Sequence, residues 1–259
     1  PQEYIDNVAK QGGIGFLAHP MERRNYFKSL PPYPWTDWTV SGFTGLEIWN
    51  QTSDWVENIR SLAHFIRLFF PRRFMSDSPT ALLNRWDEYN RHRFVAGIGG
   101  VDAHARRINL GLLSITVFPI KVELKGIRTH LYLERDLPRG DAPAAKRMLL
   151  EAMGKGHGFV SHFRRGDARG TKIFLQEENG SIRGPGLYEQ PAAPAAALLV
   201  DVPLSSEIRL FRNGECLQSK EGSHVEFPIK QQGVYRVEVR RRGRAWIYSN
   251  PFPVGRYPL

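Results

Sequence analysis

Three side chains capable of metal or acid–base chemistry follow two short apolar stretches of the sequence. The stretch GGIGFLAHP, residues 12–20, places two glycines and an apolar run before His19. The stretch VAGIGGVDAHA, residues 95–105, ends in Asp102 and His104, two positions apart. In an extended segment that spacing puts both side chains on one face, where a carboxylate and an imidazole can bind one divalent cation or act as a general base and its orienting partner.

Each of these features has a structural interpretation when it is taken alone. A single histidine at the end of a strand is often a hydrogen-bonded structural residue, and an Asp-x-His sequence is often a hydrogen-bonded turn. Their combination is more informative, because two glycine-preceded apolar strands both end in potential ligands. If the strands lie in one parallel sheet, these ends meet at one edge and form a shared site.

The elements around these residues alternate between strands and helices. Apolar runs predict strands at 13–18, 44–49 and 94–98, and helical spacing of apolar residues predicts helices at 4–11, 53–70, 79–91 and 142–154. Strands separated by helices favour a parallel α/β arrangement in the first part of the chain. Further extended segments are expected within residues 111–134.

The chain after residue 170 is expected to be all-β. Short strand patterns separated by turn residues occur at 171–177, 196–202, 207–212, 223–229, 233–240 and 245–250, and Asn213-Gly214 is a strong hairpin signal. This pattern predicts a small antiparallel β-sandwich over residues 171–259, after an α/β unit over residues 1–170. Tyr235, Trp246 and Tyr248 could form a sugar-binding platform, but their alternation along strands favours core packing.

Composition limits the possible chemistry. Cys216 is the single cysteine of the 259 residues, so metal binding must use histidine and carboxylate ligands instead of a thiolate cluster. No stretch is long and apolar enough for a transmembrane helix. The net charge of +10 is compatible with a polyanionic partner such as nucleic acid, with an anionic substrate, or with a solvated basic surface. The basic residues occur in separated groups, which favours the solvated surface.

Three motifs together resemble the PHP (polymerase and histidinol phosphatase) superfamily of metal-dependent phosphoesterases. GGIGFLAHP resembles the family's "GG…LAHP" motif, and GLEIWN, residues 45–50, resembles its "G-I-E-V-x-N" strand. GVDAHA, residues 100–105, is similar to its "G-S-D-A-H" motif, with Val101 in place of a small polar residue. The motifs occur in the family's order within about 105 residues.

The resemblance implies the carboxyl-terminal part of a distorted (βα)7 barrel over residues 1–170, with divalent zinc, manganese or iron ions at the carboxyl ends of its strands. It implies that His19, Asp102 and His104 are metal ligands. Glu47, on the matching strand, is expected to support a ligand histidine by a hydrogen bond; an ordinary strand residue is the alternative. Arg106 and Arg107 directly follow the Asp-Ala-His motif and are expected to bind an anionic small-molecule substrate.

One departure from the family pattern bears on activity. PHP proteins carry a "H-x-H" strand and further ligands before the "LAHP" motif, whereas eleven residues precede the first glycine of that motif here. We therefore expect an N-terminal segment of the same protein to supply the other ligands, and this chain alone to be inactive.

The function expected from the resemblance is hydrolysis by metal-activated water, with a phosphoester as the default substrate, in a soluble protein of the bacterial cytoplasm or periplasm. The alternative is a non-catalytic binding or scaffolding protein that contacts a glycan or polyanion through the β-sandwich and its basic surface.

Overall fold

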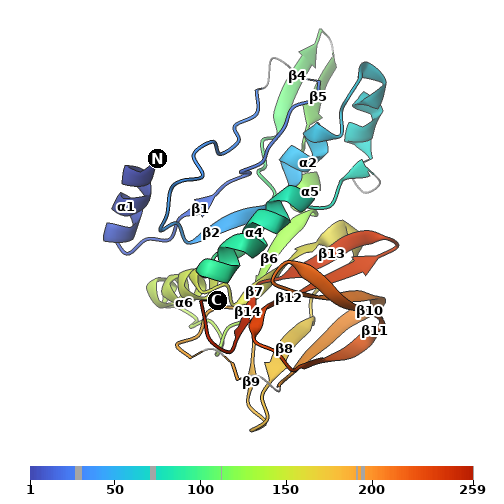
Figure 1. The fold of residues 1–259 in the computed structure, drawn as a ribbon. Coiled ribbons are helices and arrows are strands. Elements are labelled where there is room, and N and C mark those ends of the chain that lie inside the picture. The colour runs from blue at the N-terminus through green and yellow to red at the C-terminus, as the bar shows by residue number, and fades with distance from the viewer. Residues whose placement is uncertain (27–30, 71–73, 112, 191, 194–195, 259) are drawn as a thin grey trace.

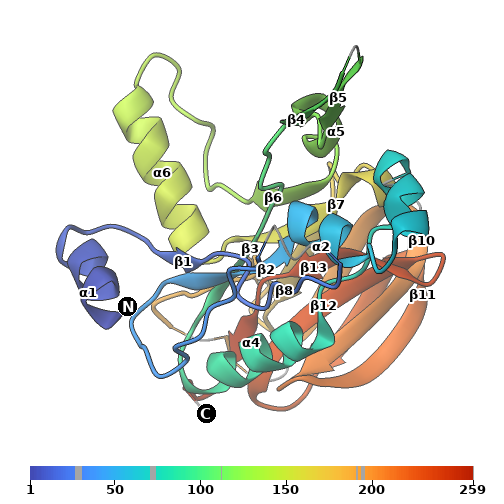
Figure 2. The same ribbon diagram turned by 90° about the horizontal axis from the view of Figure 1, so that it is seen from above.

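The computed structural model describes residues 1–26, 31–70, 74–111, 113–190, 192–193 and 196–258 (Figure 1). Within these ranges the strands form a three-stranded parallel sheet, a nine-stranded antiparallel sheet and a two-stranded hairpin. The helices lie around the parallel sheet and on one side of the antiparallel sheet (Figure 2). Among the helices in these ranges, none combines the length and apolar character needed to cross a lipid bilayer.

The parallel sheet contains the three strands predicted from the apolar runs. Its order is β1 (Phe16–Leu17), β2 (Gly45–Asn50) and β3 (Ala96–Gly100), and both pairings are parallel. Every residue of β2 is buried, as expected for a central parallel strand covered on both faces. The predicted parallel arrangement of these strands is therefore confirmed, and their carboxyl ends share one edge.

Helix α4 (Thr80–His92) packs against the parallel sheet through buried apolar residues. Trp86 is fully buried, and its indole N–H donates a hydrogen bond to the carbonyl oxygen of Val95 just before β3. A Cβ atom on Gly97 would lie 2.6 Å from the Trp86 ring, so β3 requires glycine there to let the helix approach closely.

The helix predicted over residues 53–70 is wrong in extent. The structure instead contains α2 (Gln51–Glu57) and, after a break, the 3-10 helix η1 (Leu62–Phe69). The side chain of Asn50 caps α2 by accepting from the backbone N–H of Ser53, so the helix begins two residues earlier than predicted. The side chain of Asn58 donates to the carbonyl oxygen of Asp54, where the helix ends. The other helices are α1 (Gln2–Lys10), α5 (Ile120–Glu123), α6 (Ala142–Gly154) and the 3-10 turn η2 (Phe163–Arg165).

The antiparallel sheet curls around its own core (Figure 2). Its main order is β6-β7-β13-β12-β10-β8-β9, with β11 on β10 and β14 on β12. The strands are β6 (Ile127–Leu131), β7 (Gly158–His162), β8 (Lys172–Gln176), β9 (Ile182–Arg183), β10 (Ala196–Arg212), β11 (Glu215–Ile229), β12 (Gly233–Arg241), β13 (Arg244–Ser249) and β14 (Phe252–Val254).

Strand β10 explains the curl. The sequence predicts two strands at 196–202 and 207–212, but the structure joins them into one strand with an irregular register between Asp201 and Ser206. Its first half pairs with β8 and its second half with β12. A strand that changes neighbours in this way bends the sheet, and the concave face encloses an apolar core. The predicted core packing of Tyr235, Trp246 and Tyr248 is confirmed, since each is at most 2% exposed.

The predicted fold class, a carboxyl-terminal part of a (βα)7 barrel followed by a β-sandwich, is wrong. In the described ranges, β3 is the last strand of the parallel sheet. After the β4–β5 hairpin, β6 packs beside β3 but pairs in antiparallel fashion with β7. Strand β7 in turn pairs with β13, so the antiparallel sheet extends across the predicted boundary at residue 170. The strands after residue 170 lie in one curled sheet instead of two facing sheets.

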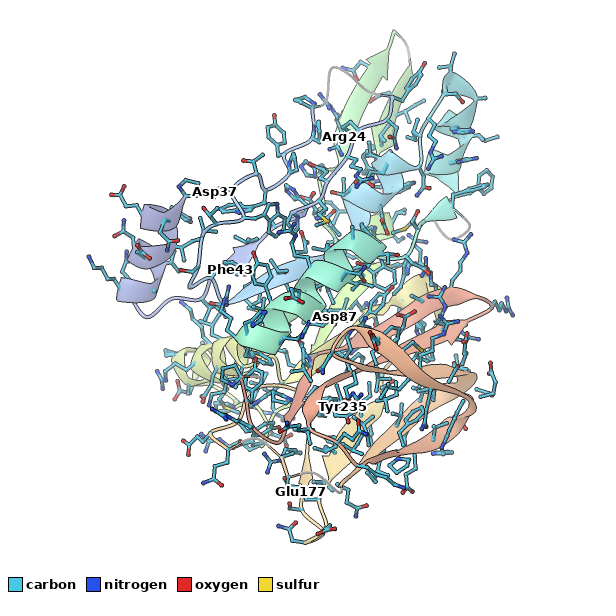
Figure 3. All side chains as sticks on the ribbon, in the orientation of Figure 1. Arg24, Asp37, Phe43, Asp87, Glu177 and Tyr235 are labelled. Atoms are coloured by element: carbon cyan, nitrogen blue, oxygen red, sulfur yellow. The ribbon has the colours of Figure 1, made fainter. Side chains whose placement is uncertain are left out.

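A buried ion pair ties α4 to the antiparallel sheet (Figure 3). Asp87 on α4 accepts two hydrogen bonds from Arg236 on β12, at 2.7 and 2.8 Å, and both side chains are less than 10% exposed. The side chain of Asn250 also bonds to the backbone of Gly97 on β3. Both contacts hold the parallel sheet, with its carboxyl edge, against the antiparallel sheet.

Candidate functional site

His19 lies at the end of β1 in a strained backbone conformation. Its φ of 30° lies on the left-handed side, which few residues other than glycine adopt. The backbone N–H of His19 donates a 2.7 Å hydrogen bond to Oε2 of Glu47 on β2. Its ring atom Nδ1 is buried and makes no hydrogen bond to any described residue; Oε2 of Glu22 is 3.7 Å away. A buried imidazole nitrogen without a partner is uncommon in a folded protein and is one feature that a bound cation would satisfy.

Glu47 lies between the ends of β1 and β3. Its Oε2 accepts from the side-chain amide of Asn50 as well as from His19. A Cβ atom on Gly100 of β3 would lie 2.4 Å from Oε1, so the carboxylate fills the space that this glycine leaves. Burial raises the pKa of Glu47, and the negative charge of Asp102 raises it further, while the bonds from Asn50 and His19 oppose the shift. Glu47 is thus electrostatically coupled to His19 at the end of β1 and to Asp102 after β3.

Asp102 and His104 lie in the loop after β3, as the motif predicted. Atom Nδ1 of His104 is 2.6 Å from the backbone oxygen of Asp102 and 3.7 Å from its carboxylate Oδ1. Asp102 and Ala105 both have positive φ, 49° and 46°, so the loop repeats the strain seen at His19. The hydroxyl of Thr52 on α2 contacts the carbonyl oxygen of Asp102 at 2.8 Å, which fixes the loop against the helix.

Glu123 belongs to the same region, although the sequence analysis did not identify it. It is fully buried on α5, its Oε1 lies 2.8 Å from the hydroxyl of Thr52, and its buried Oε2 has no hydrogen-bond partner among the described residues. Burial raises its pKa, and the charge of Asp102 adds to this effect. Residues 111–134 were expected to be extended, so a carboxylate on a short helix there was not foreseen. Pro119 before the helix was the available signal.

Glu22 is the second carboxylate that the sequence analysis missed. Burial raises its pKa, but the backbone N–H of Tyr33 at 2.7 Å and the guanidinium of Arg24 at 2.6 Å outweigh burial and lower it overall. Figure 3 shows Arg24 near α2. Because Glu22 is charged and held by these donors, it provides a fixed negative charge beside the ring of His19. Its position three residues after His19 was the available signal.

Arg106 and Arg107 lie on an exposed hairpin. They begin β4 (Arg106–Leu110), which pairs with β5 (Leu113–Val117), and both side chains are exposed. Because successive strand residues face opposite sides, at most one of the two faces the carboxyl edge of the parallel sheet.

Two groups of polar side chains therefore meet at this edge. One group is His19 with Glu22, the other is Asp102 with His104 and Glu123, and Glu47 couples the two. Within the described ranges, no three histidine, cysteine or carboxylate side chains are already arranged as a metal site. The side chain of His104 is 61% exposed.

Comparison with known proteins identifies no family: no family model matches the sequence, and no curated protein matches it.

Proposed function

We propose that this protein is a divalent-metal-dependent hydrolase whose site lies at the carboxyl edge of the three-stranded parallel sheet. The observation that carries the proposal is the position of His19, with its buried, unpartnered Nδ1, at the strand end that Glu47 couples to Asp102. Imidazole and carboxylate groups are the ligand types that zinc, manganese and iron prefer in hydrolytic sites. The proposal rests on these strand ends and does not require a closed barrel.

In this proposal His19, Asp102 and His104 hold the cation. Bound there, a divalent cation supplies a water of lowered pKa and stabilises negative charge on the substrate. Glu47 positions His19 by accepting a hydrogen bond from its backbone N–H. Thr52 and Glu123 fix the loop that carries Asp102 and His104.

A phosphoester is the proposed substrate, since its negative charge suits a cationic site. The experiment measures hydrolysis of p-nitrophenyl phosphate and of bis(p-nitrophenyl) phosphate by the protein expressed from its complete reading frame, with and without Mn²⁺ or Zn²⁺. We expect turnover that requires the metal and falls at least about 100-fold in Asp102→Asn, because that change removes a charged ligand.

The matched control is Asp201→Asn, which removes an exposed aspartate that pairs with His224 on the antiparallel sheet. Its turnover should equal that of the unchanged protein. Metal-independent turnover would contradict the proposed metal dependence. A purified protein that holds no metal and has no activity would contradict the enzyme assignment and favour a non-catalytic binding protein.

A further inference from the structure

Two basic groups that lie far apart in the sequence form one cleft in the structure. The turn η2 follows β7, and in Figure 1 it lies beside the turn between β12 and β13. Contacts between the two confirm this arrangement: Arg241 donates to the carbonyl oxygen of Arg165, and the indole of Trp246 donates to that of Gly166. An open cleft of about 920 Å³ lies between these turns and the end of α5. Its basic lining residues are Lys125, Arg164, Arg165, Arg241, Arg242 and Arg244.

The cleft carries a large excess of positive charge. Its lining includes one carboxylate, Asp167, and that group is already bound by Arg169 through Nε and Nη2 at 2.8 and 2.5 Å. Asp77 compensates Arg165 at 2.6 Å from behind the lining. Among the described residues, no ion pair reaches Lys125, Arg241, Arg242 or Arg244.

Backbone carbonyl groups hold several of these guanidinium groups in place without neutralising them. Arg164 donates through Nη2 to the carbonyl oxygen of Val122, and Arg244 donates through Nη1 to that of Met75 at 2.7 Å. Arg241 uses Nη1 in the same way, on Arg165. A guanidinium has five N–H donors, so Arg241 and Arg244 are oriented while most of their donors remain for a ligand. Such preorganised, uncompensated cations favour an anion.

The repulsion between neighbouring positive charges in the cleft affects Arg241. Burial lowers the pKa of its guanidinium, and the like charge of Arg242 lowers it further. Arg242 itself occupies the Arg242-Gly243 turn with a φ of 51°, a conformation in which asparagine or glycine is usual. Like charges held together without carboxylates are unfavourable in the absence of a ligand, and an anion relieves the repulsion.

We infer that this cleft binds single-stranded nucleic acid through its phosphate backbone. The cations come from three separate elements, so they suit successive phosphate groups better than a single one, and the arginine fork matches phosphate oxygens. The volume is at the upper end of the range of about 300–1,000 Å³ for ligand pockets, which suits a few unpaired nucleotides. Arg128 covers one face of the Phe163 ring at 3.7 Å, so recognition depends on phosphate contacts and shows little base preference.

The experiment is fluorescence anisotropy with a fluorescein-labelled dT12 strand in buffer containing EDTA, which keeps the candidate metal site empty. The test variant is Lys125→Glu with Arg242→Glu, because both side chains are exposed and no hydrogen bond is lost. Reversing two of the cleft charges should weaken binding at least about tenfold. The slope of log K against log salt should be about −3 for the unchanged protein, for four to five phosphate contacts, and shallower for the variant.

The matched control is Arg139→Glu with Lys146→Glu, which makes the same change in net charge at exposed positions in and just before α6. It should weaken binding less than about twofold, and His19→Ala should leave binding unchanged. Equal weakening by the test and control variants would show attraction to net charge alone and overturn the inference. Absence of binding at low salt, or tighter binding of a polyglutamate peptide or of duplex DNA, would also overturn it.

Discussion

His162 is a buried histidine whose pKa lies far below the usual value for an imidazole. It ends β7 at 1% exposure, neither ring nitrogen has a hydrogen-bond partner among the described residues, and its ring meets that of Trp49 edge-on at 5.4 Å. Burial, reinforced by the positive charge of Arg165, lowers its pKa to about 3. The folded protein therefore keeps this imidazole neutral at every pH near neutrality.

This burial predicts an acid sensitivity. Between pH 6.5 and 3 the unfolded chain binds a proton at His162 that the folded chain does not bind, so stability falls as the pH falls through this window. From pH 7 to pH 5 the free energy of unfolding should decrease by about 2 kcal/mol from this group. Urea unfolding at both pH values measures this loss of stability. The loss should be absent in His162→Phe and should remain in the control variant His224→Ala, which changes an exposed histidine.

If His162→Phe and the unchanged protein lose stability equally over this range, His162 is not the group responsible.

The strain at the candidate site also belongs to the residue scale. His19 and Asp102 both have positive φ, and both lie where a parallel strand ends. Strain of this kind costs of order 1–3 kcal/mol per residue and persists where surrounding contacts enforce it. Here the enforcing contacts are the hydrogen bond from the His19 backbone N–H to Glu47 and the close contact of the Thr52 hydroxyl oxygen with the Asp102 carbonyl oxygen.

At the scale of elements, α4 is the part that joins the two sheets. Its Trp86 face packs on the parallel sheet, while Asp87 reaches Arg236 on β12. The guanidinium of Arg236 also lies 4.0 Å from the centre of the Phe211 ring, so its charge is enclosed on several sides. A buried cation in this setting depends on its carboxylate partner.

Asp87→Asn should therefore destabilise the protein by about 3–5 kcal/mol, because it removes the carboxylate that accepts two hydrogen bonds from the buried Arg236 and leaves Glu238, 3.9 Å from Nη1, as the neighbouring negative charge. The double variant Asp87→Leu with Arg236→Met removes both charges and should recover most of this loss. Chemical denaturation with tryptophan fluorescence measures both effects. A loss below about 1 kcal/mol in Asp87→Asn would mean that the ion pair does not hold α4 to the sheet.

At the scale of the whole molecule, local sequence signals predicted where helices and turns lie better than they predicted which strands pair with one another. Helix α6 was predicted with its observed bounds from its own residues and from Gly154 at its end, and the structure adds that the side chain of Asp141 caps its beginning. The Asn213-Gly214 turn joins β10 to β11 as predicted, with both residues at positive φ. The alternation of side chains along a strand identifies the strand, but it does not specify which strand lies beside it.

That limit accounts for the wrong fold class. Strands β6 and β7 were assigned to a barrel because the motifs before them resemble a barrel family, and nothing in their own residues indicates an antiparallel neighbour. The long-range pairing of β7 with β13 decides the architecture, and it joins residues about 90 positions apart. The same limit hid the basic cleft, since Arg164 and Arg242 are brought together by tertiary structure alone.

The strand ends that carry the candidate residues were predicted more completely than the fold around them. The strand ends that carry His19, Asp102 and His104 were identified from their glycines and apolar runs, and β2 places Glu47 between two of them. Glu22 and Glu123 were missed because their positions depend on a loop and on a short helix that have no periodic pattern.

Cation binding at the carboxyl edge of the parallel sheet is the central claim, and a titration of the 259-residue chain with Mn²⁺ tests it most directly. Electron paramagnetic resonance measures the free ion. We predict that the unchanged chain and the control variant His224→Ala with Asp201→Asn bind Mn²⁺ equally. The test variant, His19→Ala with Asp102→Asn, should weaken Mn²⁺ binding at least about tenfold. Both double variants remove one imidazole and one carboxylate charge, but only the test variant removes them at the carboxyl edge of the parallel sheet. Equal binding by all three proteins, or no binding by any, would contradict the claim.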